Sequence, residues 1–343
     1  MERYKNLDGF RSIASISIVF MHMLVNNNFV LDNNIFIQST SKAGVYVQLF
    51  FILSAFGMCC GYYEKIKEGT ISINNFYKKR YFKLLPFFAI LVLIDVMISG
   101  FPLNSIYEGF SDLTLLFGLF PASNIEVIGV GWTLGVIFAF YCLFPFFVFT
   151  IWTKRRAWIS LIISLGINFV CSEYFLVNNY PIRSNFMRWS CYFIVGGIIY
   201  LYREEIRIFV SKFKIISIAI VLSTTTIGCL TIDWQHLDKF INTPILLSIF
   251  SVWIAYFISV ESKLLANKTT AFISDISFEI YLSHMMIYRA LEKVNLVYLF
   301  GNNTLSYILF TIMVLILSIL FSVITKFIID LILKKISKKI SAT

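Results

Sequence analysis

Charged side chains are scarce in this chain of 343 residues, because Asp, Glu, Lys and Arg together make up only 14% of it. Apolar residues make up 58%, and the mean hydropathy is +0.80. A typical soluble domain carries about 25% charged residues. The composition therefore excludes a soluble globular protein and indicates a polytopic helical membrane protein.

The sequence also lacks a hydrophilic stretch that could fold as a separate soluble domain, since such stretches span roughly 30 residues at most, below the usual domain size. Internal repeats and low-complexity tracts are absent as well. No small-residue cleavage site follows the first apolar run, so we expect it to be a membrane span and not a signal peptide. We expect one transmembrane domain over residues 1–343, with no soluble extracytoplasmic domain.

Motifs for metal binding and redox chemistry are missing. The six cysteines lie in apolar segments without a CxxC pair or a neighbouring histidine. We interpret them as small packing residues and expect no metal site. Histidine is rare too, with three in the chain.

The sequence contains ten apolar segments whose lengths are comparable to the roughly 20 residues that a helix needs to cross a bilayer. With a cytoplasmic N-terminus, 23 of the 29 Lys and Arg residues fall on the cytoplasmic side and 6 on the outer side, in agreement with the positive-inside rule. The net charge of +10 therefore reflects topology and not nucleic-acid binding. We expect an all-α bundle of about ten transmembrane helices with both termini in the cytoplasm. The segments are 9–30, 44–62, 81–99, 131–152, 158–173, 189–202, 215–232, 243–259, 271–291 and 304–333.

The first segment opens with the sequence LDGFR, which ends at Arg11, and His22 lies eleven residues further on. A helix separates these two residues by about 16 Å along its axis. Arg11 would then lie at the cytoplasmic face and His22 near the bilayer centre, where ionisable groups are unfavourable. His22 is either a bundle histidine bonded to a neighbouring helix or a proton-transfer group.

A second polar pattern lies in the ninth segment, where Ser277, Tyr281 and His284 recur at i, i+4 and i+7. They share one helix face, which must point into the bundle or a cavity. An interhelical structural network explains this stripe as well as catalysis does. Glu279 lies about 200° around the helix from Tyr281, so it has a different partner or sits at the cytoplasmic interface. His236 falls in a polar outer loop.

A basic cluster of Lys78, Lys79, Arg80 and Lys83 precedes the third segment on the expected cytoplasmic side. Topology alone accounts for such a cluster. It also suits a phosphate-bearing cofactor, since clustered Arg and Lys bind phosphate well. Trp132 opens the fourth segment, where an interfacial Trp is ordinary anchoring.

Five stretches, taken in order, resemble the membrane acyltransferase-3 family, the integral membrane O-acyltransferases that modify bacterial surface glycans. The resemblance extends over essentially the whole chain. Two positions differ from the family's motifs: Ala55 stands where the family has Gly, and Ile137 stands where it usually has Glu. The stretches are residues 7–22 (LDGFR to His22), 48–56 (QLFFILSAF), 77–86 (YKKRYFKLLP), 132–145 (WTL, then FY, then Pro) and 277–284 (SFEIYLSH).

The resemblance implies an enzyme of the bacterial plasma membrane that transfers an acyl group, commonly acetyl, from cytoplasmic acyl-CoA to a sugar hydroxyl on a surface or lipid-linked glycan. Acyl-CoA, the glycan acceptor and the lipid bilayer are the expected partners, along with a second copy of the chain or another enzyme of the glycan pathway.

The resemblance also implies roles for the residues that match the motifs. His22 would act as a general base or carry the acyl group briefly. The expected CoA phosphate-binding residues are Arg11, Lys79, Arg80 and Lys83. The stripe of Ser277, Tyr281 and His284 would orient His22 or support an oxyanion, and Arg11 joins the catalytic set. Candidate acceptor-binding residues are Trp132, Glu279 and Arg188.

Ile137 leaves open what supplies the missing carboxylate. Glu126 or Glu279 could substitute for it, the group could be dispensable, or this chain could have altered activity. A transporter or flippase for a lipid-linked glycan is the alternative function, because polar groups at the membrane midplane fit transport as well. A non-catalytic assembly subunit is a third possibility.

Overall fold

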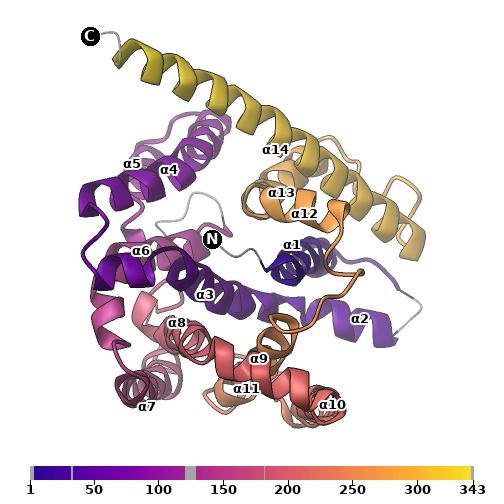
Figure 1. The fold of residues 1–343 in the computed structure, drawn as a ribbon. Helices are drawn as coiled ribbons and strands as arrows, with labels where there is room; N and C mark the ends of the chain where they lie inside the picture. Colours follow the sequence, from indigo (N-terminus) through magenta and orange to yellow (C-terminus); the bar gives the residue numbers. More distant parts are fainter. Residues whose placement is uncertain (1–3, 32–33, 120–128, 181, 341–343) are drawn as a thin grey trace.

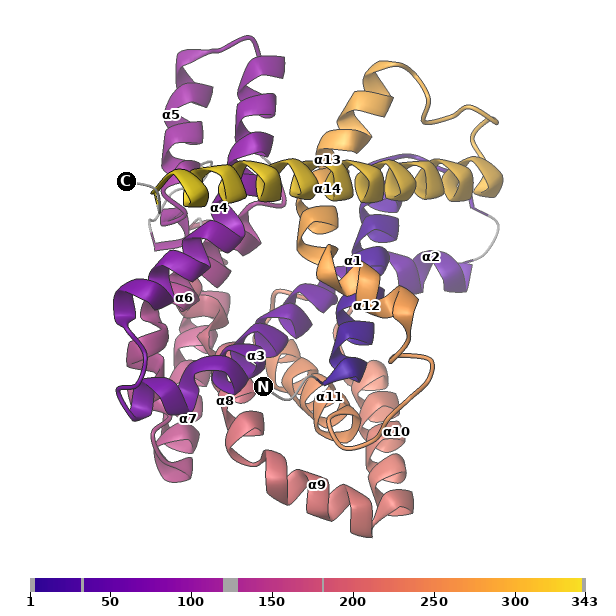
Figure 2. The same ribbon diagram turned by 45° about the horizontal axis from the view of Figure 1, so that its top comes forward.

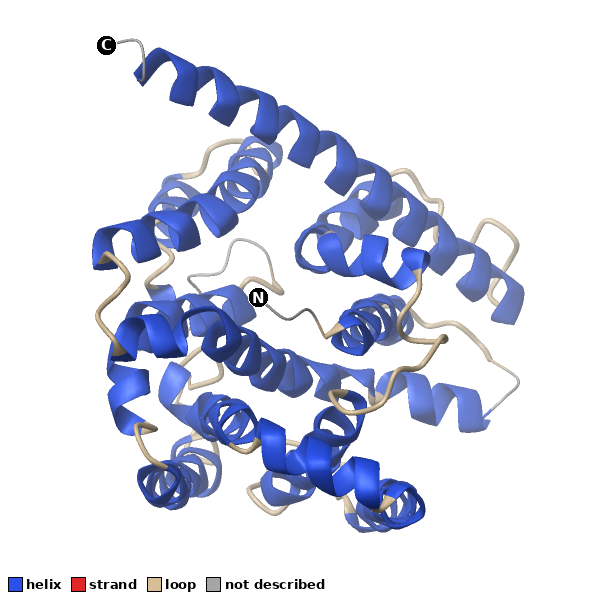
Figure 3. Ribbon diagram, viewed as in Figure 1, coloured by secondary structure: helices blue, strands red, loops and turns tan. Residues whose placement is uncertain are grey.

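The computed structural model describes residues 4–31, 34–119, 129–180 and 182–340 (Figure 1). Every regular element in these ranges is a helix, as Figure 3 shows. The predicted all-α class is therefore confirmed for the part of the chain that the structure describes.

Each of the ten predicted segments overlaps one long helix. These helices are α1 (Lys5–Val25), α3 (Tyr46–Lys67), α4 (Ile73–Ile98), α6 (Trp132–Thr150), α7 (Lys154–Val170), α8 (Phe186–Leu201), α10 (Lys214–Thr231), α11 (Asn242–Phe257), α13 (Ser277–Lys293) and α14 (Thr304–Ile340). Shorter helices are α2 (Asn34–Ser41), α5 (Leu103–Leu113), α9 (Arg203–Lys212) and α12 (Lys268–Asp275), and single turns are η1 (Ala43–Val45), η2 (Phe117–Leu119) and η3 (Cys171–Phe175).

Seven helical segments in the described ranges are long and apolar enough to cross a membrane. They are α1, α4, α6, α10, α14, the segment Phe36–Lys67 that contains α3, and the segment Lys154–Phe175 that contains α7. Helices α8 and α11 are apolar but shorter. The chain is thus a membrane protein with seven candidate spans, while the predicted count of about ten and the cytoplasmic termini stay predictions.

Helix α1 lies at the centre of the bundle, in contact with α3, α12, α13 and α14 (Figure 1). Its residues Ile18 and Val19 are fully buried. A second layer contains α3, α8 and α7, in which α8 contacts both of the others. It also contains α11 and α10, which contact each other. Helix α1 therefore carries its polar residues into the part of the molecule with the most neighbouring helices.

Helix α14 is 37 residues long, and Figures 1 and 2 show it running obliquely past α13 toward α4. It contacts α13, α1 and α4. Near α4, the ring centroids of Phe87 and Phe321 lie 6.0 Å apart. One helix thus bridges the two sides of the molecule.

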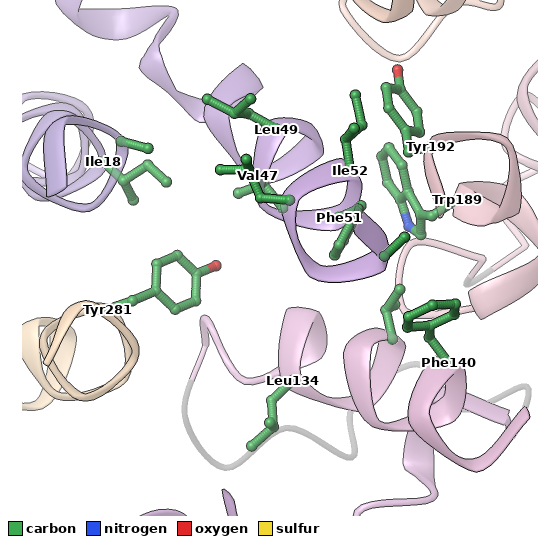
Figure 4. Close-up of a cluster of buried hydrophobic side chains, with 14 of the residues drawn as sticks. Ile18, Val47, Leu49, Phe51, Ile52, Leu134, Phe140, Trp189, Tyr192 and Tyr281 are labelled. Carbon is green, nitrogen blue, oxygen red and sulfur yellow. The ribbon is translucent and has the colours of Figure 1, made fainter. Parts of the chain in front are cut away.

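Helices α3 and α8 approach so closely because α8 has a glycine at the contact. A Cβ atom on Gly196 would lie 2.4 Å from the carbonyl oxygen of Ile52 and 2.7 Å from the Cβ of Ala55. Beside this contact, the Phe51 ring packs against Trp189 and Phe193, with centroid distances of 5.7 Å and 5.2 Å (Figure 4). The close approach fixes the position of α3, which lines the candidate site described below.

We expect Gly196→Val to destabilise the protein by about 1–3 kcal/mol, because the added atoms would overlap the α3 backbone. Thermal unfolding of the purified protein in detergent would measure this loss. Gly166→Ala in α7 is the matched control, since a Cβ there meets nothing within 4 Å and the alanine should stabilise the helix by about 0.5–1 kcal/mol. Equal melting temperatures for the two variants would contradict the close packing of α3 on α8.

Candidate functional site

The two histidines of the predicted apolar segments meet in the structure. His284 Nε2 on α13 lies 2.9 Å from His22 Nδ1 on α1, and the ring centroids are 5.0 Å apart. His284 is fully buried. The fold thus joins two side chains that are 262 residues apart in the sequence.

The hydrogen bonds of this pair determine which nitrogen of each ring carries the proton. His284 Nδ1 lies 3.3 Å from the carbonyl oxygen of Ile280. A carbonyl can only accept, so His284 Nδ1 carries a proton and its Nε2 accepts one from His22 Nδ1. The Nε2 of His22 then holds a lone pair. His22 is therefore oriented by a second residue, and Nε2 is the ring nitrogen that can accept a proton.

A cavity of about 870 Å³ lies beside this pair. Its walls come from α1, α3, α4, α6, α12, α13 and α14, together with Ile71, which precedes α4. On α3 alone the lining residues extend from Val47 to Lys65, which corresponds to about 27 Å along the helix axis. The cavity is therefore a long channel between helices.

The two ends of the cavity differ in chemistry. We call one the basic end, where the cationic lining side chains are Lys65, Lys79, Arg80, Lys83 and Lys326. The acidic side chains Asp275, Glu279 and Asp330 line the same cavity. We call the other the apolar end, where the lining side chains are Val47, Phe50, Phe51, Leu134 and Ile137. An elongated ligand with an anionic head and an uncharged tail matches this division.

Tyr281 connects the apolar end to the histidines. It lines the cavity, and its ring centroid lies 6.0 Å from that of His284 and 6.2 Å from that of Phe50. Figure 4 shows its side chain extending from α13 into the space between Val47 of α3 and Leu134 of α6. His22 and His284 themselves do not line the cavity, so Tyr281 forms the boundary between them and its interior.

The other members of the predicted stripe and its neighbour also lie on the cavity wall. The Ser277 hydroxyl donates a hydrogen bond of 2.8 Å to the carbonyl oxygen of Ser274, within the turn that starts α13. Glu279, which was expected to have a partner outside the stripe, lies 3.8 Å from the Nζ of Lys326 on α14. This ion pair ties α14 to α13 at the basic end.

All four residues predicted to bind phosphate line the same cavity. Arg80 is held by aromatic residues: one nitrogen donates to the Tyr62 hydroxyl at 2.8 Å, and the guanidinium lies over the rings of Tyr62 and Tyr141. Its buried Nε has no hydrogen-bond partner in the described part of the chain. A buried donor without a partner is unfavourable, and an anion in the cavity would satisfy it.

Arg11 is positioned by Asp8, whose role the sequence analysis missed. Arg11 Nη1 lies 3.5 Å from Asp8 Oδ1, and Nη2 donates to the carbonyl oxygen of Leu53 at 3.4 Å. The Ser274 hydroxyl also donates to Asp8 at 3.2 Å. The i, i+3 spacing of Asp8 and Arg11 is the signal that could have identified this pair. Lys326, also missed, gave no comparable signal, because it lies on a different helix far along the chain.

Trp132 and Arg188, which were predicted to bind the acceptor, lie outside the cavity lining. Trp132 is buried, with the guanidinium of Arg183 over its ring and the Trp189 ring 5.7 Å away. Arg188 is 2% exposed and forms a salt bridge of 2.6 Å with Asp238. These contacts are structural, and a role in acceptor binding stays a prediction for both residues.

Ile137 lines the cavity together with Thr133, Leu134 and Tyr141, which share its face of α6. A glutamate at this position would therefore point into the cavity. Of the two acids considered as substitutes, Glu279 also lines the cavity, whereas Glu126 lies outside the described residues. In the described ranges, no group of three or more His, Cys, Asp and Glu side chains could hold a metal ion.

Comparisons with known proteins agree with the sequence motifs. The model of the family described as "Acyltransferase domain", which is the acyltransferase-3 family, matches residues 4–325. Among curated proteins, the chain is similar to "Protein 2 in picA locus" from Rhizobium radiobacter, with 33% identity over 89 residues. The aligned stretch is 26% of this chain and 42% of that protein, so it spans less than half of the relative's length. No solved structure matches the chain.

We expect both His22 and His284 to be neutral with the proton on Nδ1, because the Ile280 carbonyl accepts from His284 and His284 accepts from His22. Nitrogen-15 NMR of labelled histidines in detergent micelles would distinguish the two ring nitrogens. His236, which is exposed beside Asp233, serves as the internal reference. In His284→Ala, His22 loses His284 as the acceptor for its Nδ1 proton, so its preference for the Nδ1 tautomer should weaken. A proton on Nε2 of His22 in the unaltered protein would refute the assignment.

Proposed function

The chain belongs to the acyltransferase-3 family, whose domain model spans residues 4–325, and we propose that it moves an acyl group from acyl-CoA to a hydroxyl of a surface or lipid-linked glycan. It is a membrane acyltransferase by that membership and by its seven candidate spans. Acetyl-CoA is the proposed donor, and the plasma membrane of a bacterium is the proposed location. The proposed catalytic unit is the single transmembrane domain over residues 1–343.

One observation carries the proposal: a histidine oriented for proton transfer lies beside a long cavity whose far end is basic. Acyl-CoA has the matching shape, with phosphates at one end and a reactive thioester at the other. The donor phosphates would contact Lys79, Arg80 and Lys83, which suits the partnerless Nε of Arg80. The pantetheine arm would then pass Arg11 toward the apolar end, over a length comparable to the roughly 16 Å between Arg11 and His22.

The proposed reaction is a direct transfer between the two substrates. His22 Nε2 accepts the proton of the acceptor hydroxyl while its oxygen attacks the thioester carbonyl. The C–S bond then breaks, the new C–O ester bond remains with the glycan, and the proton passes from His22 to the CoA thiolate. His284 holds His22 in the required tautomer, and the Tyr281 hydroxyl is the proposed donor to the oxyanion.

The basic end also supports a cytoplasmic entry for the donor. Acyl-CoA is a cytoplasmic metabolite, and the positive-inside rule assigns Lys65, Lys79 and Lys83 to the cytoplasmic side. The apolar end and His22 then lie deeper in the membrane. Acceptor and donor would approach the reaction centre from different directions.

We expect His22→Ala to lower transfer of labelled acetyl from acetyl-CoA to glycan by roughly 10²–10⁴-fold, the usual contribution of a general base. His284→Ala should lower it by roughly 10–100-fold, since His284 acts only through the orientation of His22. His236→Ala is the control and should retain activity. The assay uses membranes that contain each variant at equal abundance. Normal transfer by His22→Ala would contradict the proposed mechanism.

We expect Arg80→Ala to raise KM for acyl-CoA by roughly 10–100-fold, because a hydrogen bond to a charged group is worth about 1.5–3 kcal/mol. The value of kcat should change much less, since Arg80 contacts the phosphates and not the reacting atoms. Arg155→Ala is the matched control, as Arg155 is exposed at the start of α7 and does not line the cavity. An unchanged KM in Arg80→Ala, or an equal effect of Arg155→Ala, would place the donor phosphates elsewhere.

A further inference from the structure

Among the described residues that line the apolar end of the cavity, none carries a charge. Val47 and Phe51 of α3 and Leu134 of α6 line it and are buried, with Phe51 at 0% exposure. Thr133 and Tyr281, which also line the cavity, carry hydroxyl groups. The Thr133 hydroxyl donates to the carbonyl oxygen of Val130 at 3.0 Å, so it is already engaged. This end of the cavity has the character of a hydrocarbon-binding pocket.

Arg11 and Arg80, two of the cations that line the cavity, are engaged by other groups of the protein. The Arg11 guanidinium is bonded to the carbonyl of Leu53 and paired with Asp8, and Arg80 donates to the Tyr62 hydroxyl. Val47 lies six residues from Leu53 on α3, about 9 Å further along the axis. The desolvation of an anion beside Val47 would therefore not be offset by a direct ion pair with Arg11.

Ile137 contributes to the apolar character of this end of the cavity. It lies on the α6 face that lines the cavity, between Leu134 and Tyr141. The sequence motif that it belongs to resembles one with a glutamate at this place. Isoleucine removes a carboxylate from the wall and replaces it with a branched apolar side chain. The end of the cavity nearest Tyr281 is apolar on both the α3 and α6 sides as a result.

We propose that Ile137 and its apolar neighbours form an acyl pocket that selects neutral acyl groups, accepts a four-carbon chain as well as acetyl, and rejects acyl groups that end in a carboxylate. This inference rests on the proposed function, because it assumes that the thioester lies near Tyr281. In the transfer, the C–S bond of the donor breaks, the C–O bond of the ester forms, and the hydroxyl proton passes to the CoA thiolate through His22. The acyl chain stays in the pocket throughout.

Non-hydrolysable thioether analogues of the donor test the proposal without knowledge of the acceptor. The probes are S-ethyl-CoA, S-butyl-CoA and S-(3-carboxypropyl)-CoA, of which the last two have equal chain lengths and differ in the terminal carboxylate. Binding to the purified full-length protein in detergent is measured by calorimetry. We expect S-butyl-CoA to bind up to about 15-fold more tightly than S-ethyl-CoA, since each buried methylene contributes about fourfold. The carboxylate analogue should bind at least about 100-fold more weakly than S-butyl-CoA.

Substitutions at position 137 test the assignment of the pocket. Ile137→Leu conserves volume and polarity, so the order of the three affinities should be retained. Ile137→Glu should abolish the advantage of S-butyl-CoA over S-ethyl-CoA, because it returns a carboxylate to the wall. Ile137→Ala provides a second variant if the glutamate prevents folding, and it should reduce the affinity for S-butyl-CoA while leaving that for S-ethyl-CoA nearly unchanged.

The outcomes separate this inference from the proposed function. If S-butyl-CoA and its carboxylate analogue bind equally, or if no substitution at Ile137 alters the ranking, the acyl pocket is refuted and CoA binding still stands. If neither CoA nor any analogue binds, the proposed donor is wrong, and the inference fails with it. If the unaltered protein binds S-ethyl-CoA more tightly than S-butyl-CoA, the pocket does not accept a four-carbon chain, and that part of the proposal is wrong.

Discussion

A polar group inside a membrane protein must find its partner within the protein, because lipid offers none. The His22–His284 hydrogen bond meets this requirement and joins α1 to α13 at the centre of the bundle. The geometry of the candidate site depends on it. The Ile280 carbonyl fixes the proton of His284 on Nδ1, so His284 Nε2 accepts a hydrogen bond from His22 and fixes the tautomer of His22 as well. Tyr281, one turn before His284, lies between the histidines and the cavity. The same bond therefore joins two helices and orients the His22 ring.

The cavity beside this pair is organised by a gradient of polarity. Aromatic contacts hold Arg80 at its basic end, and Asp8 holds Arg11 further in. The lining also includes the apolar residues Val47, Phe50, Phe51, Leu134 and Ile137. Such a gradient orients an amphipathic donor in a single direction, because the reverse orientation would bury its phosphates against Phe51 and Leu134. In the proposed function, this gradient would direct the thioester end of the donor toward Tyr281 and His22.

Much of this arrangement follows from local sequence patterns. Hydropathy located the ten longest helices of the described ranges, and the i, i+4, i+7 spacing correctly grouped Tyr281 with His284 on one face. The basic cluster was recognised because its members are adjacent in the chain. The partnership of His22 with His284 was not predictable in detail, since local periodicity carries no information on which distant helices pack together. For the same reason the sequence did not indicate a role for Lys326, which lines the cavity from α14. Arg188 illustrates a different limit, because its partner Asp238 lies in a loop beyond two intervening helices.

The position of α14 in the chain has a consequence for biosynthesis. This helix supplies Lys326, Ile329 and Leu333 to the cavity wall, and it follows all the other walls in the sequence. Until α14 has been synthesised, the partial chain lacks these side chains, and Glu279 lacks its ion-pair partner Lys326. The wall of the cavity is therefore completed only by the last helix of the described part of the chain.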